Sequence, residues 1–251
     1  MRRRAQSQPR WRGQPLDAVL FDLDGTLLDT AADIGVALNR ALAEFRLQPT
    51  PDSDVRRMIG RGSPILIERA AAAQGRALDQ ATRAAMVERF FHHYGALQEN
   101  EEFRARPYEG VSEALRSLYG AGLRTAVVTN KQERFASGLL ERLQLREWVD
   151  LVVGGDSCER RKPDPQPLTF ACERLDSPPS RTLMVGDSIN DVLAARAARI
   201  PVVCVPYGYN EGNDPRELPC DALIENLSQL PPLLLTDIDA RTEASTSPGR
   251  S

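Results

Sequence analysis

The sequence predicts an α/β fold, in which a parallel sheet has helices on both faces and an all-helical cap is inserted after the first strand. Three observations support this prediction. Short apolar runs alternate with helix-like patterns through the second half of the chain, which is typical of a parallel sheet. One buried strand is expected near residue 20, and the next strand pattern comes only after residue 107. The stretch between them has apolar residues at helical spacing.

The first strand is predicted over residues 18–21, a short continuous apolar run that ends in turn residues. It leads directly into Asp22-Leu23-Asp24-Gly25-Thr26. Residues two positions apart in an extended chain share a face, so Asp22 and Asp24 can act on one reacting atom. Two close carboxylates repel each other unless a cation lies between them or one of them carries a proton. The segment therefore predicts a metal site, an acid/base pair, or both.

The helical cap is expected over about residues 30–106. Its first helix has a regular apolar stripe, and its last is followed by Pro107. The helices are predicted at 31–45, 55–59, 65–73 and 82–94. Ligands of a parallel α/β sheet bind outside the carboxyl ends of its strands. An insertion that leaves the first strand at that end must cover the site, so we expect it to act as a lid.

The elements after residue 107 complete a Rossmann-like core of residues 14–29 and 107–236. Glycine ends several of its elements, as expected where strands and helices give way to loops. Helices are predicted at 111–119, 134–145, 168–175, 191–198 and 227–235, and strands at 125–128, 151–153, 182–185, 202–205 and 222–224. Residues 1–13, which are rich in arginine, and residues 237–251 are expected to be disordered tails.

Composition limits the partners of the protein. The 251 residues carry a formal net charge of −3, so no overall basic field attracts nucleic acid or a membrane surface. No apolar run approaches the roughly 18 residues that a bilayer span needs, and no secretory signal is evident. Four cysteines lie far apart without a metal-binding spacing, which favours reduced thiols and a cytoplasmic protein. Monomer and homodimer both stay open.

Four polar stretches lie where predicted strands end or a helix begins. Each alone has an ordinary explanation as a turn, a helix N-cap or a solvated lysine. Together they supply acidic groups for a cation, hydroxyl and amide donors for an oxyanion, and one fixed positive charge. Because all four are expected at one edge of one sheet, we interpret them as one site. They are residues 22–26, Thr129-Asn130-Lys131, Lys162-Pro163-Asp164-Pro165, and Gly186-Asp187-Ser188-Ile189-Asn190-Asp191.

In this order and spacing, the four stretches resemble the four motifs of the haloacid dehalogenase superfamily of phosphatases. The resemblance implies that Asp22 is the nucleophile, which forms an aspartyl-phosphate. It implies that Asp24 is the acid for the leaving alcohol and then the base that activates water. Thr129, the Asn130 backbone N–H and Lys162 would hold the non-bridging phosphate oxygens.

The resemblance also implies a Mg²⁺ cofactor, held by Asp22, the backbone carbonyl of Asp24, and Asp187. Asp191 would support the metal through water or orient Lys162. The chemistry fits these residue types, because Mg²⁺ prefers oxygen ligands and keeps several waters. Dehalogenases of the superfamily displace halide without a metal or a leaving-group acid, so Asp24, Asp187 and Asp191 together favour phosphoryl transfer.

The cap should choose the small phosphorylated metabolite, since the core contacts only its phosphate. The loop Gly60-Arg61-Gly62 is either a helix end with a surface arginine or a specificity loop that faces the core. This loop, Thr129-Asn130-Lys131, Val153-Gly154-Gly155-Asp156 and Tyr207-Gly208-Tyr209-Asn210 resemble bacterial phosphoglycolate phosphatases, which hydrolyse 2-phosphoglycolate. Under that interpretation Arg61 reads the substrate carboxylate.

Three alternatives remain open at this point. One is a phosphatase for a larger sugar phosphate, of the N-acetylmuramate 6-phosphate type. Another is a mutase of the β-phosphoglucomutase type, which would yield isomerised sugar phosphate instead of free phosphate. The third, a non-catalytic sensor of phosphorylated metabolites, predicts a missing nucleophile or acid, whereas Asp22 and Asp24 are both present.

Overall fold

The computed structural model describes residues 8–235. Six parallel strands form its central sheet in the order β10-β9-β8-β3-β6-β7. Their bounds are Ala18–Phe21 for β3, Arg124–Val128 for β6, Leu151–Val153 for β7, Thr182–Gly186 for β8, Val202–Cys204 for β9 and Ala222–Leu223 for β10. This confirms the predicted α/β fold with a parallel sheet. The first strand, β3, lies in the middle of the sheet, between β6 and β8.

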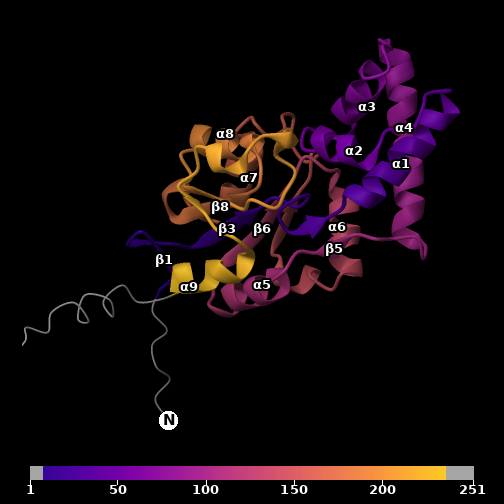
Figure 1. The fold of residues 1–251 in the computed structure, drawn as a ribbon. Helices are drawn as coiled ribbons and strands as arrows, with labels where there is room; N and C mark the ends of the chain where they lie inside the picture. The colour runs from indigo at the N-terminus through magenta and orange to yellow at the C-terminus, as the bar shows by residue number, and fades with distance from the viewer. Residues whose placement is uncertain (1–7, 236–251) are drawn as a thin grey trace, which may run out of the picture.

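Helices cover both faces of the sheet because the strands bury side chains on both (Figure 1). In β3, Val19 and Phe21 pack into one apolar cluster, and Ala18 and Leu20 pack into another, as the two-residue period of a strand requires. The first cluster includes residues of α5, α6 and α9, and the second includes residues of α7 and α8. These helices are α5 (Val111–Gly120), α6 (Glu133–Arg142), α7 (Gln166–Arg174), α8 (Ile189–Ala197) and α9 (Leu230–Leu235).

The cap consists of α1 (Ala31–Glu44), α2 (Asp52–Met58), α3 (Ser63–Ala72) and α4 (Gln80–Glu99). It has an apolar cluster of its own, which includes Leu38, Ile67, Met86 and Tyr94. Helix α4 is longer than expected from the sequence, and its N-cap is Asp79, whose side chain accepts a hydrogen bond from the Thr82 backbone N–H (2.7 Å). Figure 1 shows the cap beyond one end of the sheet.

The chain enters and leaves the cap through one short antiparallel pair. Strands β4 (Leu28–Asp29) and β5 (Arg106–Pro107) pair residue by residue, an element too short to be predicted from the sequence. Beside it, Asp33 of α1 accepts hydrogen bonds from the backbone N–H groups of Arg104 (2.9 Å) and Ala105 (2.8 Å). The two connections are therefore fixed to each other at the base of the cap.

The expected disorder up to residue 13 is wrong for residues 10–13. Strands β1 (Arg10–Trp11) and β2 (Gln14–Pro15) form a hairpin, whose turn residues Arg12 and Gly13 both have positive φ. Trp11 is buried in the same cluster as α5 and α9, and burial of so large an aromatic side chain stabilises the hairpin. Residues 1–7 of this expected tail and the expected tail 237–251 lie outside the described residues.

Short 3₁₀ turns complete the described chain, at Arg146–Trp148, Pro179–Arg181, Asn210–Gly212, Pro215–Glu217 and Leu227–Gln229. Within residues 8–235, no helix combines the length and apolar character that a bilayer span needs.

Candidate active site

The carboxyl ends of three neighbouring strands carry predicted functional residues. Asp22 follows β3, Thr129 follows β6 and Asp187 follows β8. Because β3 lies between β6 and β8, these residues lie at one edge of the sheet. The Asp22 backbone N–H donates to the Val185 carbonyl of β8 (2.9 Å), which fixes the first residue after β3. The parallel order of the strands thus brings together residues far apart in sequence.

A buried lysine connects two carboxylates at the centre of this edge. Lys162 Nζ donates to Asp22 Oδ1 (2.7 Å) and to Asp191 Oδ1 (2.6 Å). Burial lowers the pKa of Lys162, but Asp191 and Asp22 outweigh burial, so its pKa is raised and it stays charged. Burial raises the pKa of Asp22 to about 7, although Lys162 opposes the shift. The expected nucleophile therefore lies against a fixed positive charge.

Asp187 has no cationic partner among the described residues. Its Oδ1 accepts from Thr26 Oγ1 (2.7 Å) and its Oδ2 from the Tyr209 backbone N–H (2.7 Å). Both donors are neutral, and burial raises the pKa of Asp187 well above its ordinary value. Asp22, Asp187 and Asp191 each offer a carboxylate oxygen within 4.8 Å of the others. Buried oxygen donors with uncompensated negative charge suit a hard divalent cation, so the residues present fit Mg²⁺.

Asp191 contributes less to such a site than its position suggests, because both its oxygens are engaged. Its Oδ1 accepts from Lys162, and its Oδ2 accepts from Ser188 Oγ (2.8 Å) and the Ser188 backbone N–H (3.1 Å). The bond from the Ser188 backbone N–H to Asp191 is one half of the capping box of α8, and the other half joins the Asp191 backbone N–H to the Ser188 side chain. The geometry suits one of the two expected roles, in which Asp191 orients Lys162. Its bonds to the backbone N–H groups of Asp187 and Ser188 also fix the loop that carries Asp187.

Two glycines lie so close to Asp187 that neither position has room for a side chain. A Cβ atom at Gly208 would lie 2.1 Å from Asp187 Oδ2, and one at Gly25 would lie 2.4 Å away. We expect Gly208→Ala to displace the Asp187 carboxylate and to weaken Mg²⁺ binding about tenfold to a hundredfold, as measured by titration calorimetry.

Gly120→Ala is the matched control for this prediction. A Cβ atom there would meet nothing within 4 Å, and alanine suits a helix better than glycine. We expect unchanged Mg²⁺ affinity and a gain of about 0.5–1 kcal/mol in stability. Wild-type Mg²⁺ affinity in Gly208→Ala would contradict the role of Asp187.

Thr129 and Asn130 lie between the core and the cap. Both are buried and line a cavity that also contains Asp22. The Asn130 side-chain nitrogen donates to the carbonyls of Gly60 (2.9 Å) and Lys162 (2.9 Å). Asn130 therefore joins the cap loop to the loop that carries Lys162, a contact that the sequence did not reveal.

Asp24 contacts a second buried lysine. Its Oδ1 accepts from Thr30 Oγ1 (2.6 Å), and its Oδ2 lies 3.0 Å from Lys131 Nζ. Burial lowers the pKa of Lys131, but Asp24 outweighs burial and the pKa is raised. The Lys131 ammonium also lies 4.6 Å from the centre of the Tyr94 ring on α4, in the range of a cation–π contact.

Lys131 was missed as a site residue, although the composition contains a signal for it. The chain has 32 lysine and arginine residues, and only Lys131 and Lys162 are lysines. Their side chains are at most 8% exposed, and both contact a carboxylate that follows β3. At these two positions the chain holds a compact ammonium, where a planar guanidinium would need more space.

The cap loop brings only two of its three predicted residues to the site. Gly60 and Gly62 line the cavity, whereas Arg61 is exposed and does not. Gly60 and Gly62 have positive φ, +124° and +82°, a backbone that favours glycine. This turn directs the two glycines inward and leaves the arginine outside. The structure thus does not support the expectation that Arg61 reads a substrate carboxylate.

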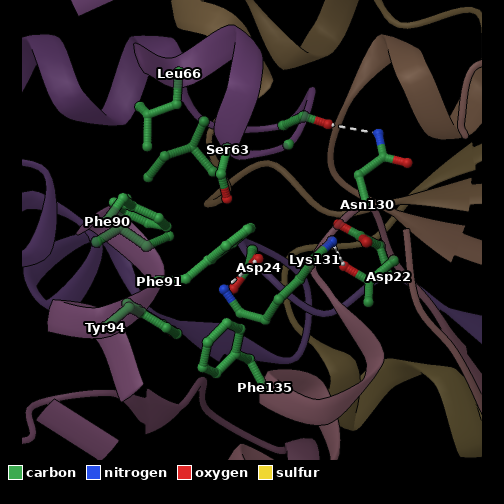
Figure 2. Close-up of a pocket in the computed structure, with 15 residues that line it drawn as sticks. Asp22, Asp24, Ser63, Leu66, Phe90, Phe91, Tyr94, Asn130, Lys131 and Phe135 are labelled. Atoms are coloured by element: carbon green, nitrogen blue, oxygen red, sulfur yellow. Dashed lines mark hydrogen bonds and ion pairs between the residues drawn. The ribbon is translucent and has the colours of Figure 1, made fainter. Parts of the chain in front are cut away.

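The cavity between core and cap is small and largely apolar. Its volume is about 50 Å³, and Asp22, Asp24, Thr129, Asn130 and Lys131 form its core side. Figure 2 shows Lys131 and Asp24 between the aromatic side chains and Asp22. The cap and helix α6 supply the apolar wall, which includes Leu66, Phe90, Phe91, Tyr94 and Phe135.

Tyr209 is a further residue whose role was not foreseen. Its hydroxyl accepts from the backbone N–H groups of Thr30 (2.8 Å) and Ala31 (3.0 Å) and donates to Asp29 (2.8 Å). Its own backbone N–H holds Asp187. One residue thus connects the first turn of the cap to the candidate metal site.

Comparison with known proteins places this geometry in a family. The model of the haloacid dehalogenase-like hydrolases matches residues 19–205. The chain belongs to this family. The match runs from the second residue of β3 to just past β9, and so it contains the carboxyl ends of β3, β6 and β8.

This haloacid dehalogenase-like hydrolase also has relatives that are similar along nearly their whole length. It is 43% identical over 221 residues to the phosphoglycolate phosphatase of Nitrosospira multiformis, covering 88% of this chain and 96% of that one. It is 41% identical over 217 residues to that of Thiobacillus denitrificans, covering 86% and 94%.

Among solved structures, one described as a predicted phosphoglycolate phosphatase of Haemophilus somnus superposes with a TM-score of 0.79 at 29% identity. The superposition covers 86% of this chain and 96% of that chain. The chain is accordingly a hydrolase of the phosphatase class, as expected from its four motifs.

Proposed function

We propose that this hydrolase converts 2-phosphoglycolate to glycolate and phosphate through an aspartyl-phosphate, with Mg²⁺ as cofactor. The observation that carries the proposal is that Asp22 and Asp24 both line a small cavity of about 50 Å³ between the core and the cap. A water molecule needs roughly 10–15 Å³ of such volume, so the cavity suits a short leaving group. The relatives named phosphoglycolate phosphatase, 36–43% identical to this chain, support the same substrate.

In the first step, a carboxylate oxygen of Asp22 attacks phosphorus and the bond from phosphorus to the ester oxygen breaks. Lys162, which contacts Asp22 at 2.7 Å, supplies a positive charge for the phosphate oxygens. Thr129 and the backbone N–H of Asn130 supply hydrogen-bond donors for the same oxygens. When bound, Mg²⁺ would screen the repulsion between Asp22 and the phosphate dianion and stabilise charge at phosphorus.

Asp24 transfers the protons. It donates one to the departing oxygen, which releases glycolate. It then takes one from a water molecule, whose oxygen attacks phosphorus and releases phosphate and free Asp22. Thr30, which donates to Asp24 Oδ1 (2.6 Å), orients the carboxylate so that Oδ2 can face the leaving group. One water is consumed in each cycle.

The cavity volume also weighs against the larger substrates. The sugar of a sugar phosphate has many more atoms than glycolate, and the aromatic side chains of the cap narrow the space beside Asp24. A mutase must in addition let a sugar turn within this space.

A screen of phosphorylated metabolites with Mg²⁺, scored by released phosphate, tests the proposal. We expect 2-phosphoglycolate to be the best substrate by kcat/KM and glycolate to appear in equal amount to phosphate. Preference for a hexose phosphate, or isomerised sugar phosphate in place of free phosphate, would overturn it.

The proposal extends to the compartment, which we take to be the cytoplasm. The four cysteines Cys158, Cys172, Cys204 and Cys220 are free thiols, as is usual in a reducing compartment.

A further inference from the structure

The two lysines of the chain occupy the two ends of the candidate active site. Lys162 lies with Asp22, at the end where the phosphate would bind. Lys131 lies 3.0 Å from Asp24, the residue proposed to face the leaving group. The side chain of Lys131 is only 8% exposed. A group bonded to the leaving oxygen must extend past Asp24 into the cavity, and Lys131 is the cationic side chain that lines it.

A hydroxyl whose proton has no acceptor lies beside this lysine. Tyr94 on α4 is 1% exposed, and the polar group next to its Oη among the described residues is Lys131, which is itself a donor. The Lys131 ammonium lies over its ring, 4.6 Å from the centre. A buried hydroxyl without a partner is unfavourable, so the Tyr94 O–H is a donor in need of an acceptor.

The donors that remain fit an acidic group. An ammonium has three N–H donors, and the recorded anionic partner of Lys131 is Asp24. Tyr94 adds an O–H donor from the cap side of the cavity. A carboxylate offers two oxygens that accept several hydrogen bonds, whereas an alkyl group would leave both donors unused.

The surroundings strengthen such a contact. Phe90, Phe91 and Phe135 form the wall around Lys131 and Tyr94 (Figure 2). Water-excluding walls increase the interaction between a cation and an anion. Lys131 keeps Asp24 as a partner in either case, but a substrate that lacks the acidic group gains nothing from the N–H groups of Lys131 that remain or from the Tyr94 O–H, so such a substrate is disfavoured.

We infer that Lys131 and Tyr94 form the subsite that binds the carboxylate of the leaving group. The hydrolase would then select phosphate monoesters of short hydroxy acids, with one lysine for each anionic end of the substrate. This inference rests on the proposed function, and it replaces Arg61 with Lys131 as the residue that reads the carboxylate.

The test compares 2-phosphoglycolate with ethyl phosphate, in which a methyl group replaces the carboxylate. We expect the wild-type protein with Mg²⁺ to prefer 2-phosphoglycolate by about tenfold to a hundredfold in kcat/KM, the range of a charge-assisted hydrogen bond. Lys131→Met should bring the ratio of the two kcat/KM values close to one. Tyr94→Phe, which removes one oxygen, should lower the ratio about fivefold.

Because both substrates are measured on one preparation, a loss of folded protein cancels in the ratio. If Lys131→Met fails to fold, Tyr94→Phe tests the same subsite. Tyr119→Phe on α5 is the matched control, since Tyr119 is 44% exposed and outside the site; its ratio should equal that of the wild type.

An equal loss on both substrates in Lys131→Met, with an unchanged ratio in Tyr94→Phe, would overturn the inference and leave Lys131 as a positioning residue for Asp24. The proposed function fails differently. Wild-type protein that released phosphate from neither ester would overturn the proposed function and this inference with it.

Discussion

Asp22→Asn is expected to reduce turnover of 2-phosphoglycolate by about 10³-fold or more, the scale seen when a covalent nucleophile is removed. An amide oxygen is a poor nucleophile toward phosphorus and cannot form the acyl phosphate. Lys162 keeps its second partner, Asp191, at 2.6 Å, so the positive charge stays in place. The measurement is phosphate release from protein free of contaminating phosphatase.

The fold should withstand this substitution. Burial raises the pKa of Asp22 to about 7, so the charged carboxylate is unfavourable in the folded protein, whereas asparagine is neutral and nearly the same shape. We therefore expect a melting temperature equal to or above that of the metal-free wild type. Asp176→Asn is the matched control. Asp176 is exposed, and its positive φ of 50° is one that asparagine tolerates. The activity of this variant should equal that of the wild type. Substantial turnover by Asp22→Asn would remove Asp22 from its role.

Removal of the metal by a chelator is expected to stop turnover as completely as the Asp22→Asn substitution does. Asp187 is buried and has only neutral donors, Thr26 and the Tyr209 backbone N–H. Without a divalent cation, Lys162 offsets only part of the negative charge of Asp22, Asp187 and Asp191, whose carboxylates lie within 4.8 Å of one another, and the remainder repels the incoming phosphate. Excess EDTA should abolish phosphate release, and added Mg²⁺ should restore it.

Ca²⁺ should inhibit, because its larger and looser shell of ligands would misplace Asp22 relative to phosphorus. A second readout is independent of activity. A cation that binds the folded state alone stabilises it by about 2.7 kcal/mol at a hundred times its Kd, so Mg²⁺ should raise the melting temperature of wild type more than that of Gly208→Ala. Robust turnover in excess EDTA would contradict the metal site.

The sheet was predictable from the sequence because its strands are buried on both faces. Residues 18–21 are a continuous apolar run that ends in two acidic residues, and β3 has these bounds in the structure. The hairpin at Arg10–Pro15 was not predictable in this way, since two-residue strands have no periodicity. Its one signal was Trp11, an aromatic residue in a segment otherwise typical of a disordered tail.

The core of the site was predictable for the same topological reason, whereas its cap side was not. Parallel strand ends converge wherever the sheet order allows, so Asp22 and Asp187 could be brought together by reasoning alone. The contacts of Lys131 with Asp24 and Tyr94 depend on how α4 packs over the core. The outward position of Arg61 depends on the φ values of two glycines, which a sequence does not fix.

The pairing of Leu28 with Pro107 and Asp29 with Arg106 has a consequence for how selectivity can diversify. Because the two ends of this segment lie side by side, the α/β core can hold a segment of any length or fold at this point without a change in its own geometry. Replacement of residues between these ends can alter which leaving group is accepted, while the strands that carry Asp22 and Asp187 keep their register. Substitutions that change selectivity can therefore accumulate in the segment between β4 and β5, while the residues that act on the phosphate stay in place.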